Sequence, residues 1–206
     1  MGRKYIAVAG NMGAGKSSLV HFLCARYDVQ PFYEPNEENP YLQDFYKDMK
    51  RWAFHSQVYF LCRKFRIHQE LDRARSSRTV IQDRTIYEDA EIFAANLYRS
   101  RRIAKRDYET YRALYESMVA ALRPPDLLIF LSGSLRTIRK RIQLRGRPEE
   151  QSVPVSYLRR LNLLYEDWFK RYDLSPTVVL QTDEMDYVTN LMDRLDLIET
   201  IERILG

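Results

Sequence analysis

The chain has 206 residues, and its 33 Lys and Arg against 28 Asp and Glu give a formal net charge of +5. With 7 Gly and 8 Pro, and with 15 Tyr and 9 Phe to fill a core, it is neither collagen-like nor low in complexity. We expect one domain over residues 1–206, whose positive charge permits an anionic ligand, a phosphorylated substrate or nucleic acid.

Five short apolar runs predict strands at 5–9, 31–33, 79–81, 127–131 and 178–180. They are rich in Val, Ile and Leu without polar alternation, as in a parallel sheet that is covered on both faces. Helical periodicity between the runs predicts helices over 17–27, 45–75 with a break near Lys50, 87–98, 108–122, 135–144, 155–172 and 187–205. The predicted fold class is therefore α/β, a five-stranded parallel sheet flanked by helices.

A glycine-rich segment lies between the first predicted strand and the first predicted helix. Residues 10–17 read G-N-M-G-A-G-K-S, the G-x-x-x-x-G-K-[ST] pattern of the phosphate loop (P-loop). Its glycines let backbone N–H groups surround phosphate oxygens, while Lys16 reaches the β- and γ-phosphates and Ser17 holds Mg²⁺. The predicted nucleotide-binding residues are Gly10, Asn11, Met12, Gly13, Ala14, Gly15, Lys16, Ser17 and Ser18.

Charged residues follow the next two predicted strands. Glu34 comes directly after 31–33, and Asp83 with Arg84 follows 79–81. The carboxyl ends of parallel strands meet at the edge of the sheet where α/β folds bind ligands. There a carboxylate can take the proton of an acceptor hydroxyl, and an arginine can steady the same oxygen. Asp83 is also a candidate partner of Ser17 for Mg²⁺.

An arginine-rich segment follows late in the chain. Arg141 and Arg145 share one helix face, and Arg147 comes just after Gly146, which ends the helix. An anion such as a triphosphate would relieve the repulsion among the three guanidinium groups. We expect a lid over about 141–152. A small chain with such a lid and no GTPase motif favours phosphoryl transfer to a small acceptor.

The sequence lacks signs of export or membrane insertion. Its apolar run at 5–9 is too short for the core of a secretion signal, and no run approaches the length of a membrane span. Cys24 and Cys62 stand far apart without a Cys-x-x-Cys pattern, so we expect both to be reduced core residues. These features predict a cytoplasmic protein with no membrane partner.

An ordered set of segments resembles the deoxynucleoside kinases, a family with deoxycytidine, deoxyguanosine and deoxyadenosine kinases and the insect multisubstrate enzyme. The matching segments are 10–17, Glu34-Pro35, Tyr46, 51–57 (R-W-A-F-H-S-Q), 83–89 (D-R-T-I-Y-E-D) and 144–151 (L-R-G-R-P-E-E-Q). The resemblance implies phosphorylation of a deoxynucleoside 5′-hydroxyl by ATP with Mg²⁺, in nucleotide salvage. It also implies a homodimer, to which helices 45–75 and 87–98 would supply the face.

The resemblance further implies roles at the reacting end of the substrate. Glu34 is the general base, Arg84 steadies the 5′-oxygen, and Lys16 contacts the transferred phosphate. Tyr46 and Glu150 hold the sugar 3′-hydroxyl. Asp83 and Ser17 form the magnesium side, and Arg141, Arg145 and Arg147 form the lid.

For the base, the resemblance implies that Gln57 and Asp89 face its edge and that Phe93 stacks on it. The amide of Gln57 suits this role because it offers one acceptor and two donors. The family's base-edge arginine aligns with Lys64, and Arg63 is one residue off that register. Only one of these two can point into the pocket, since neighbouring helical residues are about 100° apart.

The sequence departs from the family pattern at three places. Asp83 and Thr85 stand where the family usually has Glu and Ser, which keeps the carboxylate and the hydroxyl. Lys64 replaces the base-edge arginine, and Asn39 stands where many animal members have Trp. The E-E-N-P-Y segment at 37–41 is similar to that of bacterial purine-directed members. We therefore expect deoxyadenosine as the substrate, with deoxyguanosine next and deoxycytidine also considered.

Two other functions compete with this interpretation. A nucleoside-monophosphate kinase such as thymidylate kinase shares the P-loop, the Asp-Arg pair and the lid, and Arg63, Lys64 and Arg66 could hold its acceptor phosphate. A nucleotide-regulated nucleic-acid-binding protein would explain the basic run at 99–106. We expect that run to be a solvated loop and no nucleic acid to bind, because the sequence has no known nucleic-acid-binding motif.

Overall fold

The computed structural model describes residues 3–34, 39–151, 153–183 and 190–205. Within them, one parallel sheet has the strand order β2-β3-β1-β4-β5. The strands are β1 (Tyr5–Gly10), β2 (Val29–Phe32), β3 (Thr79–Asp83), β4 (Leu127–Ser132) and β5 (Thr177–Gln181). The structure confirms the five predicted strands and their parallel pairing, with each end within two residues of its expected position.

The helices also follow the sequence prediction closely. They are α1 (Lys16–Arg26), α2 (Leu42–Lys47), α3 (Met49–Ala74), α4 (Ile86–Glu88), the π-helical turn η2 (Asp89–Ala94), α5 (Ala95–Arg99), α6 (Lys105–Val119), α7 (Leu135–Arg145), α8 (Pro148–Gln151), α9 (Val155–Arg171) and α10 (Leu191–Leu205). The break predicted near Lys50 is at Asp48, whose side chain caps α3 by accepting from the Arg51 N–H at 3.1 Å. Pro35, residue 152 of the lid and the start of the last predicted helix lie outside the described residues.

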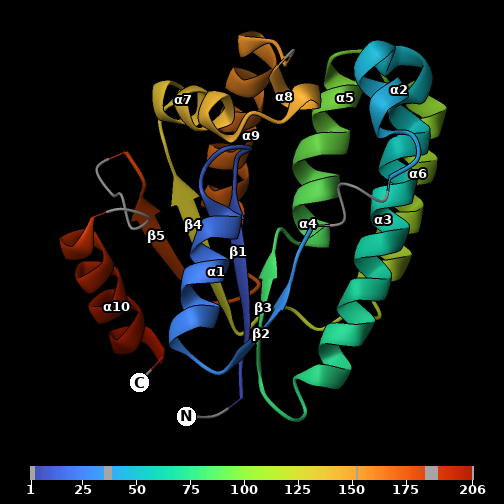
Figure 1. The fold of residues 1–206 in the computed structure, drawn as a ribbon. Coiled ribbons are helices and arrows are strands. Elements are labelled where there is room, and N and C mark those ends of the chain that lie inside the picture. Colours follow the sequence, from blue (N-terminus) through green and yellow to red (C-terminus); the bar gives the residue numbers. More distant parts are fainter. Residues whose placement is uncertain (1–2, 35–38, 152, 184–189, 206) are drawn as a thin grey trace.

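Helices cover both faces of the sheet (Figure 1). Strand β1 shows why its sequence lacks polar alternation. Tyr5, Ala7 and Ala9 pack into a core cluster with α3, α6 and α9, whereas Ile6 and Val8 pack into a second cluster with α1 and α10. Because both faces are buried, every position of the strand is apolar.

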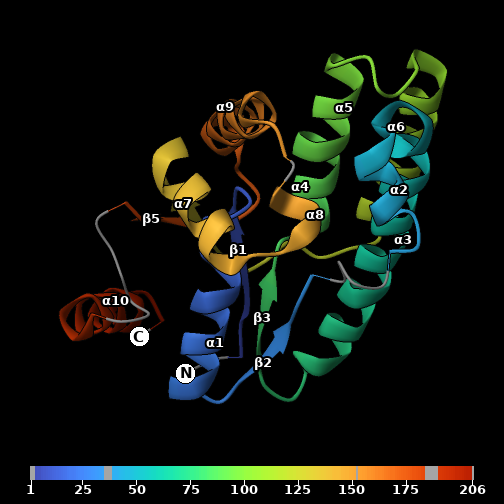
Figure 2. The same cartoon turned by 45° about the horizontal axis from the view of Figure 1, so that its top comes forward.

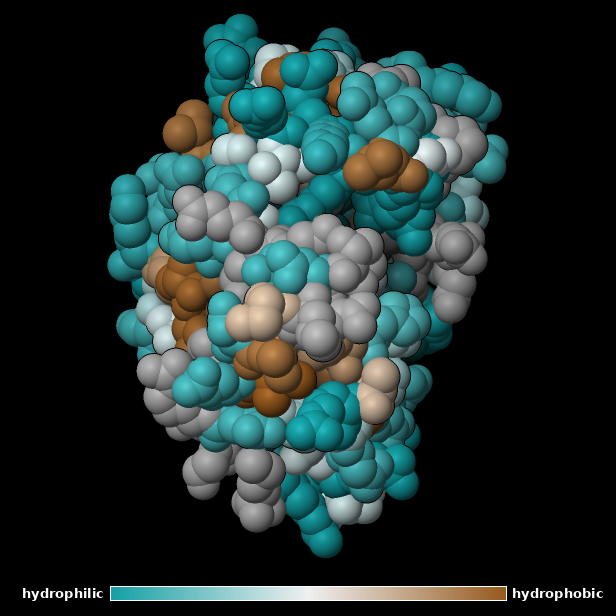
Figure 3. Space-filling model, turned by 60° about the vertical axis from the view of Figure 1, so that its left-hand side comes forward, coloured by the Kyte–Doolittle hydropathy of each residue, from teal (hydrophilic) through white to brown (hydrophobic). Residues whose placement is uncertain are grey.

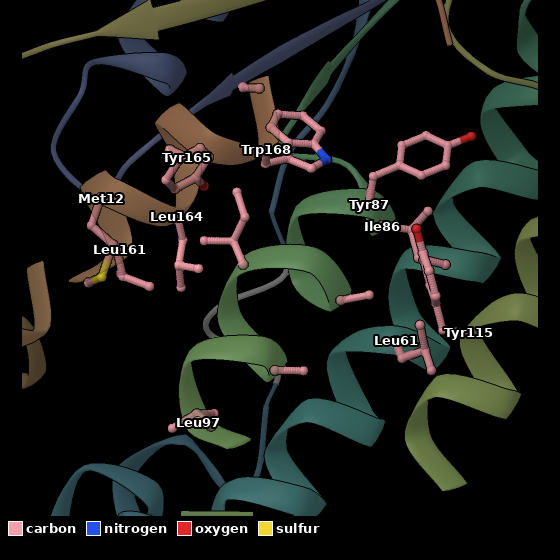
Figure 4. Packing of buried hydrophobic residues seen from close by; sticks show 14 of the residues in the cluster. Met12, Leu61, Ile86, Tyr87, Leu97, Tyr115, Leu161, Leu164, Tyr165 and Trp168 are labelled. Carbon is pink, nitrogen blue, oxygen red and sulfur yellow. The ribbon is translucent and has the colours of Figure 1, made fainter. Parts of the chain in front are cut away.

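Helices α4, η2 and α5 form one continuous rod that is enclosed by its neighbours. Figure 4 shows Leu61 of α3 and Tyr115 of α6 on one side of this rod, and Leu164 and Trp168 of α9 on the other. Residues 86–97 are buried apart from Glu91 and Phe93, which are partly buried. Helix 87–98 therefore has little exposed surface with which to contribute to the predicted dimer face.

The carboxyl ends of the strands point toward α7, α8 and α2, and Figure 2 shows α7 and α8 lying across this edge of the sheet. None of the helices in the described residues has the length and apolar character needed to cross a bilayer. On the face seen in Figure 3, hydrophilic side chains dominate and apolar ones form small groups. Both cysteines are unpaired, but Cys62 is exposed on α3 and is not a core residue.

Candidate active site

A cavity of about 440 Å³ opens at the carboxyl edge of the sheet. It lies between the P-loop, the ends of β2 and β3, helices α2 and α3, turn η2 and the segment that joins α7 to α8. The predicted site residues that line it are Met12, Gly13, Lys16, Ser17, Glu34, Tyr46, Gln57, Asp83, Arg84, Asp89, Phe93, Arg145, Arg147 and Glu150. The structure thus brings most of the predicted site into one cavity.

The P-loop has the backbone that its glycines were expected to allow. Gly13 has a φ of +74° and Gly15 a φ of +104°, values that other residues rarely adopt. A Cβ on Gly13 would also lie 2.8 Å from the Ile138 carbonyl oxygen of α7. The Lys16 ammonium donates to the Asn11 carbonyl at 3.1 Å. Burial, with a smaller effect from Arg84, lowers the pKa of Lys16 to about 8, and a bound phosphate would favour its charged form.

Glu34 and Arg84 form the best-defined pair in the cavity. Nη1 of Arg84 donates to both carboxylate oxygens of Glu34, at 2.6 and 2.8 Å. The guanidinium carbon lies 4.5 Å from the centre of the Phe93 ring. Burial by itself would lower the pKa of Arg84, but the nearby carboxylates, Glu34 first, hold it well above its usual range. Arg84 is therefore a permanent cation that fixes the Glu34 carboxylate against the cavity.

Ser17 and Asp83 meet beside this pair. The Ser17 hydroxyl donates to Oδ2 of Asp83 at 2.5 Å. The second carboxylate oxygen of Asp83 is buried and has no hydrogen-bond partner among the described residues. Carboxylate and hydroxyl oxygens are suitable ligands for Mg²⁺, which keeps several waters and takes further oxygens from substrate phosphates. The two side chains thus fit the magnesium role predicted for them.

Gln57, Asp89 and Phe93 line the cavity on the side of α3 and η2. Oε1 of Gln57 and Oδ2 of Asp89 are buried and lack a hydrogen-bond partner among the described residues. Burial raises the pKa of Asp89 to about 7, although the charge of Lys64 opposes the increase. Turn η2 supplies both Asp89 and Phe93, and π-helical turns are frequent at functional sites. These unpaired oxygens can accept hydrogen bonds from a ligand.

Two of the predicted lid arginines contact the carboxylate of Glu150. Arg145 donates to one of its carboxylate oxygens, and Nη1 of Arg147 lies 3.6 Å from the other. Tyr46 of α2 lines the same cavity, and burial raises the pKa of its hydroxyl, so that it stays a donor at neutral pH. The predicted sugar-side residues and two of the three lid arginines are therefore neighbours.

Lys64 and Arg141 are placed differently from the prediction. Neither lines the cavity. The ammonium of Lys64 donates to the carbonyls of Asp83 and Arg84, which turns it away from the base edge. Arg141 donates to the carbonyls of Ala14 at 2.9 Å and Thr182 at 2.7 Å, so it ties α7 to the P-loop and to the end of β5.

The cavity is also lined by residues that the sequence prediction did not name: His21, Tyr33, Leu42, Phe45, Phe60 and Tyr157. The prediction also gave no role to Glu88, a buried residue that contacts the P-loop. It is fully buried and accepts from the Gly10 N–H at 3.3 Å, the Thr85 N–H at 2.8 Å and the Tyr165 hydroxyl at 2.9 Å. Burial raises its pKa. Its contacts join the P-loop to the start of α4. The signal for it was the Thr-x-x-Glu capping box formed with Thr85.

A P-loop beside a carboxylate–arginine pair and an arginine lid defines a phosphotransferase that acts on a small acceptor. The model of the deoxynucleoside kinase family matches residues 6–206. The deoxyadenosine/deoxycytidine kinase of Bacillus subtilis is 36% identical over 92% of this chain and 90% of its own. The deoxyguanosine kinase of Lactobacillus acidophilus is 37% identical over 95% and 88%. A structure of M. mycoides deoxyadenosine kinase with bound dATP has a TM-score of 0.83 at 31% identity, covering 98% of this chain and 100% of that one.

The chain belongs to the deoxynucleoside kinase family. It is therefore a kinase whose acceptor is a deoxynucleoside, as the ordered motifs implied, and the nucleoside-monophosphate kinase interpretation is set aside. The relatives include kinases of deoxyadenosine, deoxycytidine, deoxyguanosine and thymidine, so family membership does not identify the base that this chain prefers.

Proposed function

We propose that the protein transfers the γ-phosphoryl group of ATP to the 5′-hydroxyl of deoxyadenosine, as a cytoplasmic salvage enzyme. The observation that carries the mechanism is the Glu34 carboxylate, held on both oxygens by Arg84 at the cavity wall. Glu34 accepts the proton of the 5′-hydroxyl as its oxygen attacks the γ-phosphorus of ATP, and the bond from that phosphorus to the bridging oxygen breaks to release ADP. Arg84 then stabilises the charge that develops on the transferred group.

The phosphate end of the mechanism uses the P-loop and the lid. Lys16 binds the β- and γ-phosphates, and Arg145 and Arg147 close over them from the lid at about 141–152. Ser17 and Asp83 would hold Mg²⁺, which supplies neutralisation of phosphate charge when bound. The similar M. mycoides enzyme has been solved with dATP and with dCTP, which supports a triphosphate site in this fold.

The base preference rests on the two unpaired oxygens of Gln57 and Asp89. Both are acceptors, and adenine offers an exocyclic amino group as donor beside a ring nitrogen that can accept from the amide of Gln57. Guanine and thymine carry a carbonyl where adenine has its amino group, so an acceptor at that position would face another acceptor. Cytosine offers the same amino donor and ring acceptor as adenine. Tyr46 and Glu150 hold the 3′-hydroxyl of the sugar.

The test of this function is a panel of the four deoxynucleosides at saturating ATP, ranked by kcat/KM. We expect deoxyadenosine first, ahead of deoxyguanosine and thymidine by more than ~10-fold, because mispaired polar groups are costly in a buried site. A ranking led by deoxyguanosine or thymidine would contradict the proposed base recognition, and one led by deoxycytidine would contradict the preference for deoxyadenosine. In a matched panel, Gln57→Ala should change mainly the ranking of the bases.

A further inference from the structure

Lys64 is a buried residue whose hydrogen bonds within the described residues go to two consecutive backbone carbonyls. Its side chain is 0% exposed, and the ammonium donates to the carbonyl oxygens of Asp83 at 3.3 Å and Arg84 at 2.6 Å. It also lies 4.0 Å from Oε1 of Glu34. A buried ammonium is stable only when its protons are hydrogen-bonded and its charge is compensated. Here three oxygens at the ends of β2 and β3 meet both needs.

The residue that Lys64 contacts most closely has a strained backbone. Arg84 has a φ of +61°, in the left-handed region that residues with a side chain rarely occupy. Its N–H donates to the Val8 carbonyl of β1 at 3.0 Å, and its own carbonyl accepts from Lys64. Such a conformation persists only where its surroundings fix it. Val8 and Lys64 together fix both polar backbone atoms of Arg84.

This backbone sets the direction of the guanidinium. With N–H and carbonyl both held, the side chain of Arg84 leaves the strand end toward Glu34 and meets both of its oxygens. The ammonium of Lys64 also lies beside the Glu34 carboxylate, so its charge helps to hold Glu34 next to Arg84. A lysine that recognised the base edge would have to give up the two carbonyls and leave them buried without a donor.

We propose that Lys64 is a positioning residue for phosphoryl transfer, which holds the Arg84 turn and the Glu34 carboxylate in place and does not recognise the base. The proposal rests on the roles proposed above for Glu34 and Arg84. It assigns to Lys64 a part in the rate of transfer and no part in the choice of deoxynucleoside.

The main variant is Lys64→Met, which keeps the length of the side chain and removes its charge and donors. We expect kcat to fall by about 10²-fold, because a displacement of about 1 Å at a reacting group costs that much in rate. The loss should be the same within about threefold for every deoxynucleoside accepted, and KM for ATP and deoxynucleoside should change by less than about threefold. Lys105→Met, on an exposed lysine of α6, is the matched control and should behave as wild type.

A change in the protonation of Asp89 could also alter kcat in Lys64→Met, because the charge of Lys64 lowers the pKa of Asp89. The comparison is therefore repeated in an Asp89→Asn background, where no carboxyl group can change its protonation. The loss of kcat on removing Lys64 should be the same in that background. If Lys64→Met does not fold, Lys64→Gln, which keeps one donor without the charge, decides in the same assays.

A changed ranking of the bases with kcat near wild type, in either background, would overturn the proposal and make Lys64 a recognition residue. Equal kcat, KM and ranking in wild type and variant would also overturn it. Failure of the roles proposed for Glu34 and Arg84 would look different, since Glu34→Gln would then keep the kcat of wild type.

Discussion

Asp89 illustrates how burial sets the state of a single carboxyl group in this cavity. Its side chain is almost fully buried, and one oxygen lacks a partner among the described residues. Burial raises its pKa from 3.8 to about 7, against the opposing charge of Lys64. The folded protein therefore binds this proton more tightly than the unfolded chain does. The stability that the group contributes is full below pH 3.8 and is lost as the pH rises through about 7.

Asp89→Asn should consequently stabilise the protein more at pH 8 than at pH 5. At pH 5 the amide replaces a protonated acid of similar shape, whereas at pH 8 it replaces a buried charge. Thermal melts of wild type and variant at the two pH values measure this difference. Asp167→Asn, on an exposed carboxylate of α9, is the control. An equal change in Tm at both pH values would contradict the raised pKa.

Single residues also show the reach of sequence-based prediction. Glu34, Arg84 and Gln57 line the cavity as the sequence predicted. Their positions after predicted strands were sufficient to place Glu34 and Arg84, and the family resemblance placed Gln57. Lys64 was expected at the base edge because it aligns with the family's base-edge arginine, and such an alignment does not show which atoms the side chain contacts. Its actual contacts depend on the carbonyls that the left-handed turn at Arg84 presents, and no motif indicates that turn.

At the scale of elements, the side chain of Arg141 hydrogen-bonds α7 to the backbone of the nucleotide site. Arg141 donates from its two terminal nitrogens to Ala14 of the P-loop and Thr182 beyond β5. Both acceptors are backbone carbonyls, so the contact depends on the backbone of the P-loop. Gly146, with a φ of +69°, ends the helix and releases the chain toward Arg147 and Glu150. Arg141 thus anchors the helix from which the lid extends.

Removing this anchor should lower stability and weaken ATP binding together. Hydrogen bonds from a charged group contribute about 2 kcal/mol, which for a chain of this size corresponds to a fall in Tm of ~4–8 °C in Arg141→Met. We expect KM for ATP to rise as well, since the P-loop loses a support. Arg139→Met, on an exposed arginine of the same helix, should change neither quantity. Unchanged Tm and KM in Arg141→Met would contradict the anchoring role.

Among the elements, those defined by local patterns were predictable and those defined by packing were not. The strands and long helices follow from apolar runs and helical periodicity. The π-helical turn η2 had no local signal, because it arises where one rod is enclosed by α3, α6 and α9. That turn delivers Asp89 and Phe93 to the cavity, so part of the base pocket depends on tertiary packing.

At the scale of the whole molecule, the structure favours a different surface for a homodimer from the one that the sequence predicted. The rod from α4 to α5 is enclosed, and the long helices with outward faces on this side are α3 and α6 (Figure 1). Leu114 of α6 is 40% exposed there. We propose that two copies associate through the outward faces of α3 and α6.

Light scattering after size exclusion should give twice the chain mass of 24.6 kDa. Leu114→Glu should shift the protein toward the single-chain mass, because a charge at the centre of an apolar contact is costly. Leu163→Glu, on an exposed leucine of α9, is the control for an added surface charge and should stay dimeric. A single-chain mass for wild type at micromolar concentration would contradict the dimer.

At the scale of the whole molecule, the P-loop and the ends of β2 and β3 meet in one cavity, where Glu34 is the proposed base for phosphoryl transfer. The most direct test measures kcat on deoxyadenosine and the Kd for ATP in Glu34→Gln. We expect kcat to fall by ~10²–10⁴-fold, as for a lost general base, while the Kd for ATP changes by less than about threefold. Turnover near that of wild type, with ATP bound normally, would contradict the role of Glu34 and with it the proposed mechanism.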